Sequence, residues 1–441
     1  MYSKEEVLKY HQGGKVGLRL PRPLKTADDL CLAYTPGVAH AVKEIAARPD
    51  SACECTAKSN LVAVVTDGTA ILGLGDLGAL ASIPVMEGKA VLFKAFGDVD
   101  GWPVPLAKCR VGGADAGKTD PQRVIDACMA IAPMYGGINL EDIAAPACFE
   151  IEDRLDAALD IPVFHDDQWG TAVISLSGVM NYARLAGKEL KDLKVVMNGA
   201  GAAGIRICEM CKAAGVVDVT MCDSRGTIRR DRADLNPYKA RHAVDTPAKT
   251  LREALAGADV FIGVSAANVL TGEDVKTMGE FPAIFAMANP DPEIAPPEVA
   301  AALAGRRYVM VTGRSDYPNQ INNVLGFPYL FRGALDVRAT TINKEMKVAA
   351  ANALAALARE PVPAEVAALY PGERLEFGEG YIIPKPFDRR LFEVVSYAVA
   401  EAAVRSGVAR RQIDLAEYRA SLAERNKDAR VGGAEPATAR P

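Results

Sequence analysis

Short apolar runs alternate with longer amphipathic stretches along most of this chain. The runs that we predict to be strands are 61–66, 90–93, 103–109, 194–197, 216–222, 258–264, 281–288 and 307–311. The stretches that we predict to be helices, from apolar positions at the helical period, are 38–47, 120–134, 146–159, 202–214, 250–256, 342–359 and 387–406. Strands that alternate with helices in this way predict an α/β fold with parallel sheets.

One strand–helix pair carries a glycine pattern at its turn. The run 194–197 leads directly into Gly199, Ala200, Gly201, Ala202, Ala203 and Gly204, and the helix 202–214 follows. In dinucleotide-binding units the first glycine allows a tight turn, the second lets the pyrophosphate approach the backbone, and the third lets helix and strand pack closely. A chance loop would lack this flanking strand and helix. We therefore predict that residues 199–204 bind a dinucleotide and that Asp223, after the next strand, contacts its adenosine ribose.

The composition limits the class of protein. The chain has 441 residues, of which 49% are hydrophobic and 24% charged, and this favours a globular protein with more than one domain. A net charge of −5 without a sustained basic run argues against nucleic acid as a partner. The N-terminus lacks a signal-like apolar region, no apolar run is long enough to span a bilayer, and the nine scattered cysteines fit reduced thiols. We expect a cytoplasmic protein with no membrane partner.

The predicted organisation has four parts. An N-terminal α/β catalytic domain occupies 1–160, and a Rossmann-like, doubly wound dinucleotide-binding domain occupies 161–380. Helices in 381–425 are expected to pack back on the core. The Gly-, Pro- and Ala-rich segment 426–441 is expected to be a disordered tail.

Two acidic pairs follow apolar segments instead of polar loops. Asp166 and Asp167 come after the run 161–164 and His165, and Glu141 with Asp142 follows another short, mostly apolar segment. Such pairs are usually solvated surface charge. Directly after apolar runs, however, they offer the hard oxygen ligands that a divalent cation prefers.

A lysine and a tyrosine are further candidates for chemistry. Lys89 follows a glycine at the start of the predicted strand 90–93; it is either a solvated charge or, if buried, a base with a lowered pKa. Tyr34 precedes a Pro-Gly turn and a helix, where it either packs half-buried or presents its phenol.

Nine segments together resemble one family, the malic enzymes in their short prokaryotic form, over residues 32–405. They are YTPGVA at Tyr34, ILGLGDLGA at Ile71, PVMEGKAVLFK at Pro84, LED at Leu140, FHDDQWGTA at Phe164, GAGAAG at Gly199, ANPDPE at Ala288, GRSDYPNQINN at Gly313 and YIIPKPFD at Tyr381. The resemblance implies oxidative decarboxylation of L-malate to pyruvate and CO2, with reduction of NAD(P). It also implies a homo-oligomer, a dimer or a tetramer.

The resemblance assigns a metal site. It implies that Glu141, Asp142 and Asp167 bind Mg²⁺ or Mn²⁺, which would act as a Lewis acid and template for malate. Asp166 matches a neighbouring site residue, and we interpret it as a residue that supports these ligands without binding the ion.

The resemblance also assigns acid–base and substrate roles. Lys89 matches the general base, which a nearby cation and partial burial would keep neutral, and Tyr34 matches the general acid that protonates the enolate. Asn289 and Asn323 match residues that contact the substrate and the nicotinamide ribose, and Asn322 lies beside the latter.

Two choices stay open at this point. Ala70 stands where larger relatives carry an arginine for a substrate carboxylate, so the distal carboxylate of malate has no assigned partner; Lys94 and Arg314 are candidates. Asp223 favours NAD, whereas Arg225 close behind it can accommodate the 2′-phosphate of NADP, and we expect NADP. A malolactic enzyme that makes lactate on a retained NAD, and a non-catalytic dinucleotide sensor, are the alternative functions.

Overall fold

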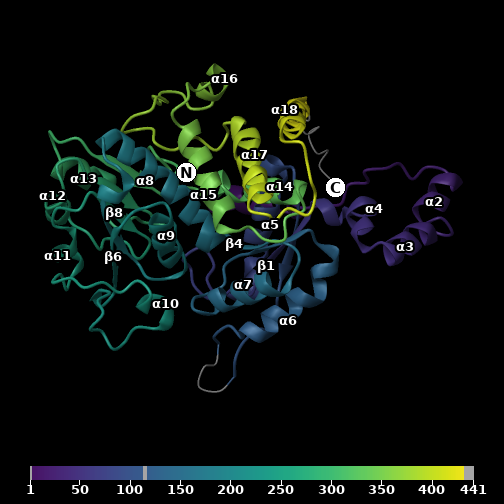
Figure 1. Cartoon of the computed structure of the whole chain (residues 1–441), viewed down its shortest axis with the longest axis horizontal. Helices are drawn as coiled ribbons and strands as arrows, with labels where there is room; N and C mark the ends of the chain where they lie inside the picture. Colours follow the sequence, from purple (N-terminus) through teal and green to yellow (C-terminus); the bar gives the residue numbers. More distant parts are fainter. Residues whose placement is uncertain (1, 113–116, 432–441) are drawn as a thin grey trace.

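The computed structural model describes residues 2–112 and 117–431, and its strands form two mainly parallel sheets (Figure 1). The first sheet has the order β2-β1-β3-β4. Its strands are β1 (Leu61–Thr66), β2 (Asp100–Pro105), β3 (Gly137–Leu140) and β4 (Val163–His165), and they are connected by α5 (Gly78–Gly97), α6 (Pro121–Ile131) and α7 (Ala147–Ala158). Every pairing in this sheet is parallel, so all four strands end at one edge.

The second sheet has the order β10-β9-β8-β5-β6-β7. Its strands are β5 (Lys194–Asn198), β6 (Asp218–Asp223), β7 (Gly226–Thr227), β8 (Val260–Gly263), β9 (Ala283–Ala286) and β10 (Val309–Thr312), with helices α9 (Ala202–Ala213), α10 (Pro237–Ala240), α11 (Leu251–Leu255), α12 (Gly272–Lys276) and α13 (Pro296–Ala302). The strand order reverses between β5 and β8, where such sheets bind dinucleotides. The predicted α/β class with a doubly wound dinucleotide-binding sheet is confirmed.

Helices after the second sheet join it to the first. The helix α14 (Phe327–Asp336) packs on α5 and α17 (Arg390–Arg405), and α15 (Lys344–Leu357) packs on α17 and α8 (Thr171–Ala186). The ring of Phe93 on α5 meets Phe327 and Phe331 edge-on, with centroids 4.7 and 5.2 Å away. Because one buried apolar cluster includes residues of both sheets, the two lobes share a core. The short helix α16 (Ala364–Ala367) lies outside this contact.

The N-terminal helices form an arm at the side of the molecule. The arm contains α1 (Lys4–His11), α2 (Ala27–Ala33), α3 (Val38–Ala47) and α4 (Ala52–Cys55), and Figure 1 shows α2, α3 and α4 beyond the edge of the two sheets. None of the helices α1, α2 and α3 has a buried residue. Leu32 and Tyr34 are 78% and 67% exposed. Within one chain the arm therefore adds nothing to the core.

Helix α5 corrects the predicted strand 90–93. The buried residues Ser82, Met86, Ala90, Phe93 and Gly97 recur every three or four positions and define one helical face. A short apolar run cannot distinguish a buried strand from one side of a buried helix. Lys89 therefore lies in the middle of a helix and not at the start of a strand.

Two predicted boundaries also differ from the structure. Strand β4 pairs with β3, so the boundary proposed at residue 161 falls inside the first sheet. Helix α18 (Leu415–Val431) packs on α17 with Leu422 fully buried, so the segment 426–441 begins as helix; residues 432–441 lie outside the described residues. Within the described part, no helix is long and apolar enough to cross a membrane.

Candidate active site

Parallel pairing brings the two acidic pairs together at the carboxyl edge of the first sheet. Leu140 at the end of β3 lies opposite His165 at the end of β4, and both acidic pairs follow directly. The backbone N–H of Asp142 donates to Oδ2 of Asp167 at 2.7 Å. Open α/β sheets bind their ligands at this edge, because loops from neighbouring strands meet there.

Lys89 enters this cluster from helix α5. Its Nζ lies 3.0 Å from Oε1 of Glu141, donates to Oδ2 of Asp166, and lies 4.8 Å from the centre of the Phe327 ring. The Lys89 side chain is 15% exposed, whereas those of Glu141 and Asp166 are 1% and 0% exposed. Lys89, Glu141 and Asp166 thus form a nearly dry ionic centre, in which charge interactions are stronger than at the surface.

Burial opposes every charge in this centre. Burial alone would lower the pKa of the Lys89 ammonium, but the carboxylates of Asp166 and Glu141 raise it above its ordinary value. Burial together with the Asp167 carboxylate raises the pKa of Asp142 to about 7. Burial also raises the pKa values of Glu141, Asp166 and Asp167. The Lys89 pKa is raised because the carboxylates around it outnumber its single ammonium.

The acidic residues fit a divalent cation by their chemistry. Oδ2 of Asp142 is buried and has no hydrogen-bond partner, and four carboxylates face one ammonium. Such an excess of mostly buried negative charge favours a compensating cation or protons on the carboxylates. Within the described residues, no group of three His, Cys, Asp or Glu side chains has an arrangement that could hold a metal ion without a change of side-chain conformation. Lys89 takes one oxygen of Glu141, and Asp167 accepts from the Asp142 backbone.

Asn323 reaches the same centre from the second lobe. Its Nδ2 donates to Oδ2 of Asp166 at 3.1 Å, and its Oδ1 accepts from the hydroxyl of Thr171 at 3.1 Å. A Cβ at Gly170 would lie 2.0 Å from Oδ1 of Asp166, so only glycine fits there. Asn322 instead caps a short helix, because its Oδ1 accepts from the backbone N–H of Val324 at 3.0 Å.

The three glycines of the fingerprint have the geometry that their roles require. Gly199 has φ +116°, and a Cβ there would lie 2.7 Å from the carbonyl oxygen of Val264. A Cβ at Gly204 would lie 1.8 Å from the carbonyl oxygen of Gly199, whereas one at Gly201 meets no atom within 4 Å. Helix α9 begins directly after Gly201, so its N–H groups face the open side of the loop.

Asp223 ends β6 as predicted, but its carboxylate is already occupied. Arg232 donates to both oxygens at 2.8 and 3.1 Å, and Lys239 donates to Oδ2 at 2.7 Å. Burial opposes the charge, but these hydrogen bonds lower the pKa of Asp223 to about 2. A ribose hydroxyl that binds Asp223 would therefore share this carboxylate with Arg232 and Lys239.

Asn289 lies where the two lobes meet. A Cβ at Gly73, in the loop after β1, would lie 2.9 Å from the carbonyl oxygen of Asn289. The loop of Asn289 is tied to β8 by the buried Glu293, which accepts from the N–H groups of Ala288 and Ser265 at 2.9 Å each. The glycine-rich segment after β1 thus permits close packing between the lobes.

Three candidates lie away from the cluster. Tyr34 is in the exposed arm and has no hydrogen bond from its side chain within the described residues. Lys94 pairs with Asp98 at 2.8 Å on the surface of α5, and Arg314 pairs with Asp316 at 2.8 Å. Both cations thus have an acidic partner outside the cluster, and neither contacts a residue of the cluster.

Several residues of the site were not identified from the sequence. Asn139 donates to Oε1 of Glu141 at 2.7 Å, and its place two residues earlier on the same face of β3 was a usable signal. Thr171, Arg232 and Lys239 gave no such signal, because only the fold brings them to their partners.

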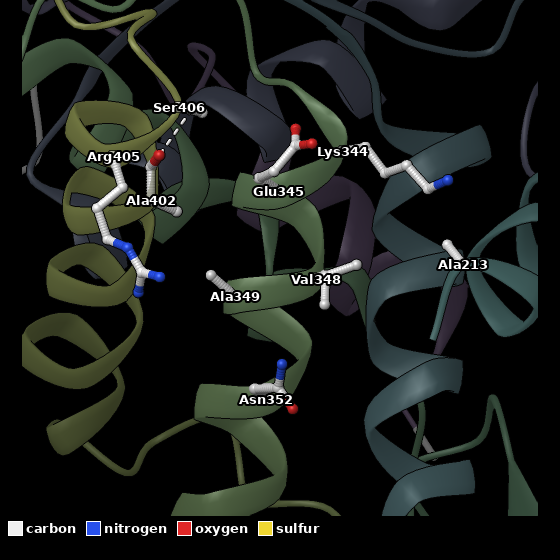
Figure 2. Close-up of a pocket in the computed structure, with 9 residues that line it drawn as sticks. All are labelled: Ala213, Lys344, Glu345, Val348, Ala349, Asn352, Ala402, Arg405 and Ser406. Atoms are coloured by element: carbon white, nitrogen blue, oxygen red, sulfur yellow. Dashed lines mark hydrogen bonds between the residues drawn. The ribbon is translucent and has the colours of Figure 1, made fainter. Parts of the chain in front are cut away.

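A surface groove elsewhere in the molecule contains none of these residues. It has a volume of about 580 Å³ and lies between α9, α15 and α17. Figure 2 shows that Lys344, Val348 and Asn352 border it from α15 and Arg405 from α17. The side chains that line this groove are small, or they carry charges that do not converge on one point. The acidic edge of the first sheet is therefore the better candidate for catalysis.

Known proteins resemble this chain along most of its length. The family model "Malic enzyme, N-terminal domain" matches residues 15–156, and "Malic enzyme, NAD binding domain" matches residues 169–373. An NADP-dependent malic enzyme of Rhizobium meliloti is 53% identical over 96% of this chain, which spans about half, 55%, of that protein. An NAD-dependent malic enzyme of Geobacillus stearothermophilus is 51% identical, covering 91% of this chain and 79% of its own length. The crystal structure of a malic enzyme from Pyrococcus horikoshii is 40% identical, with a TM-score of 0.83 over 97% of this chain and 99% of that one.

Proposed function

Because the chain belongs to the malic enzyme family, we propose that it converts L-malate to pyruvate and CO2 while it reduces a nicotinamide dinucleotide. One observation carries the proposal: Lys89 lies against Glu141 and Asp166, with Asp142 and Asp167 beside them, at the carboxyl edge of the first sheet. The reaction needs a base at the malate hydroxyl, a hydride acceptor, an electron sink for decarboxylation and an acid at the enolate carbon. The site offers the base and the carboxylates for a cation, whereas the acid is assigned to Tyr34, outside this cluster.

Glu141, Asp142 and Asp167 would hold Mg²⁺ or Mn²⁺. The unpartnered Oδ2 of Asp142 and the excess of carboxylates support this assignment. When bound, the ion supplies Lewis-acid chemistry at the hydroxyl and carbonyl oxygen of the substrate. The glycine loop, Asn289 and Asn323 would hold the dinucleotide that accepts the hydride.

Lys89 takes the proton from the malate hydroxyl. Two contacts orient it: Asp166 accepts from its Nζ, and Asn323 in turn donates to that same carboxylate. Glu141 and Asp167, which are assigned to the cation, are among the carboxylates that raise the pKa of Lys89. A cation that neutralises their charge would therefore lower the pKa of Lys89 toward its ordinary value. Asp166 then remains as the neighbour that sets the position of the lysine.

Tyr34 donates the proton to the enolate carbon, and it does so in a homodimer. Within one chain the arm leaves Tyr34 67% exposed, with Leu30 and Leu32 also exposed beside it. An apolar arm without a core of its own fits a surface on a second copy, and a two-fold dimer would then offer each site the Tyr34 of the other chain.

The dinucleotide is NADP. Arg225, Arg232 and Lys239 gather at the end of β6, where Arg225 and Arg232 also pair with Asp234. Three cations thus face the two carboxylates of Asp223 and Asp234, and the excess positive charge suits a 2′-phosphate. The Arg225 side chain is 71% exposed, so its guanidinium can reach such a group.

A product assay tests the proposed reaction. Purified protein is incubated with L-malate, Mn²⁺ and either NADP or NAD, and NAD(P)H, pyruvate and lactate are measured together. Pyruvate with an equal amount of NADPH supports the proposal. Lactate without accumulation of reduced dinucleotide would show the malolactic reaction instead. Binding of NADPH without turnover of malate would show a sensor and overturn the catalytic assignment.

A further inference from the structure

A second buried network lies directly behind the acidic cluster and contains none of the residues assigned above to the substrate, the metal ion or the dinucleotide. It surrounds the π-helical turn Asp166–Gly170, which carries the two aspartates after β4. The network consists of Glu152 on α7, Arg206 on α9 and Lys347 on α15, which are 4%, 6% and 7% exposed. Three buried charged residues from three helices around one turn call for a physical reason beyond packing.

Glu152 holds the turn at both of its ends. Its Oε1 accepts from the backbone N–H of His165 at 2.9 Å, and its Oε2 accepts from Nε1 of Trp169 at 3.0 Å. His165 directly precedes Asp166, and Trp169 directly follows Gln168, so these two bonds bracket both aspartates. Lys347 lies 3.6 Å from the centre of the Trp169 ring and so also holds the indole in place.

Arg206 connects the same turn to the dinucleotide loop. It lies in the second turn of α9, the helix that starts directly after Gly201. Its Nε donates to Oε1 of Gln168 at 2.8 Å, its Nη2 lies 3.6 Å from Oε2 of Glu152, and its guanidinium lies 4.5 Å from the centre of the Trp169 ring. Helix α9 also packs directly on the turn. A displacement of α9 therefore moves the residues that carry Asp167.

We propose that Glu152 and Arg206 are positioning residues that couple occupancy of the dinucleotide loop to the geometry of the metal-binding turn. The inference rests on the proposed function, because it takes Asp167 as a metal ligand. A dinucleotide that settles on the N-terminus of α9 fixes Arg206, which fixes Gln168 and, through Glu152, the backbone on each side of the aspartates. Linkage then requires that the metal ion strengthens dinucleotide binding by the same factor.

Direct binding of Mn²⁺ tests this coupling without turnover. The full chain is titrated with Mn²⁺ by calorimetry, with and without saturating NADPH, for the wild type and for Arg206→Met, which keeps the apolar stem but loses the hydrogen bonds. We expect Mn²⁺ to bind the wild type more tightly when NADPH is present. In Arg206→Met the affinity for Mn²⁺ should fall by roughly tenfold or more, and the ratio of the two Mn²⁺ affinities should approach one.

Two further variants separate positioning from folding. Trp169→Phe removes the Nε1–H that donates to Glu152 and should also weaken Mn²⁺, so the proposal stays testable if Arg206→Met does not fold. Glu209→Gln removes the negative charge of an Arg206 partner, 2.9 Å from its Nη1, that makes no hydrogen bond to the turn. This variant should bind Mn²⁺ as the wild type does. Variants that only lower the melting temperature, with unchanged Mn²⁺ affinity and coupling ratio, overturn the inference. A wild-type chain that binds no Mn²⁺ overturns the proposed metal site itself.

Discussion

Replacing Arg232 by methionine should change the dinucleotide preference. The guanidinium of Arg232 donates to both oxygens of Asp223, at 2.8 and 3.1 Å, and is only 13% exposed. In Arg232→Met the cations at the end of β6 no longer outnumber the carboxylates, and Asp223 keeps Lys239 as its remaining cationic partner. The freed oxygen of Asp223 then favours an unmodified ribose and repels a 2′-phosphate.

The size of this effect follows from the bonds that are lost. Hydrogen bonds to charged groups contribute about 1.5–3 kcal/mol, which corresponds to about 10- to 150-fold in affinity. We expect kcat/KM for NADP to fall by about that factor, while kcat/KM for NAD stays the same or rises. The assay is initial rates with malate and Mn²⁺ for both dinucleotides, with fluorescence titrations of NADPH and NADH as a measure independent of turnover.

A matched variant serves as the control. Arg230→Met removes a nearby arginine that is 68% exposed and pairs with Asp245 at 3.0 Å instead of Asp223. Because exposed ion pairs contribute about 0–1 kcal/mol, its ratio of NADP to NAD should remain near that of the wild type. If Arg232→Met keeps the wild-type ratio, or if Arg230→Met changes it equally, the assignment of Arg232 to the 2′-phosphate is refuted.

Three other outcomes are expected. Tyr34→Phe and Lys89→Met should each be nearly inactive alone. If sites are shared across a two-fold dimer, an equimolar mixture of the two variants, refolded or exchanged together, should regain about a quarter of wild-type activity. An inactive mixture that is proven to contain heterodimers would argue against shared sites. Gly201→Ala should bind NADPH weakly but keep the wild-type melting temperature. Gly204→Ala should bind NADPH weakly and also melt at a lower temperature, because its Cβ would lie 1.8 Å from the Gly199 carbonyl oxygen. Equal melting curves for the two variants would contradict this difference in stability. Burial lowers the pKa of Lys347 to about 8 from 10.5, so between these pH values the unfolded chain binds more protons than the folded chain. From pH 8 to 10 the unfolding free energy of the wild type should therefore rise by about 2 kcal/mol relative to that of Lys347→Met. Parallel pH profiles of the two proteins in denaturant titrations would exclude the shift.

Much of the fold and part of the site follow from local sequence. The strand at 61–66 and the unit from 194 to 223 combine apolar period, glycine turn and helix within short windows, and each local signal agrees with the final structure. These features depend on contacts between near neighbours in the chain.

The remaining features depend on contacts that only the folded chain creates. Lys89 was misplaced on a strand because a short apolar run has the same composition in a strand and in a buried helix, and only packing of α5 against α14 distinguishes them. Its partner Asp166 is 77 residues away, and Asn323 reaches the same carboxylate across 157 residues. Arg232 neutralises Asp223 through a loop that no pattern predicts. Local sequence thus determined most strands of the second sheet and the glycine turn after β5. Tertiary packing decided which cation faces which carboxylate, because the charge state of a buried group depends on neighbours in space and not along the chain.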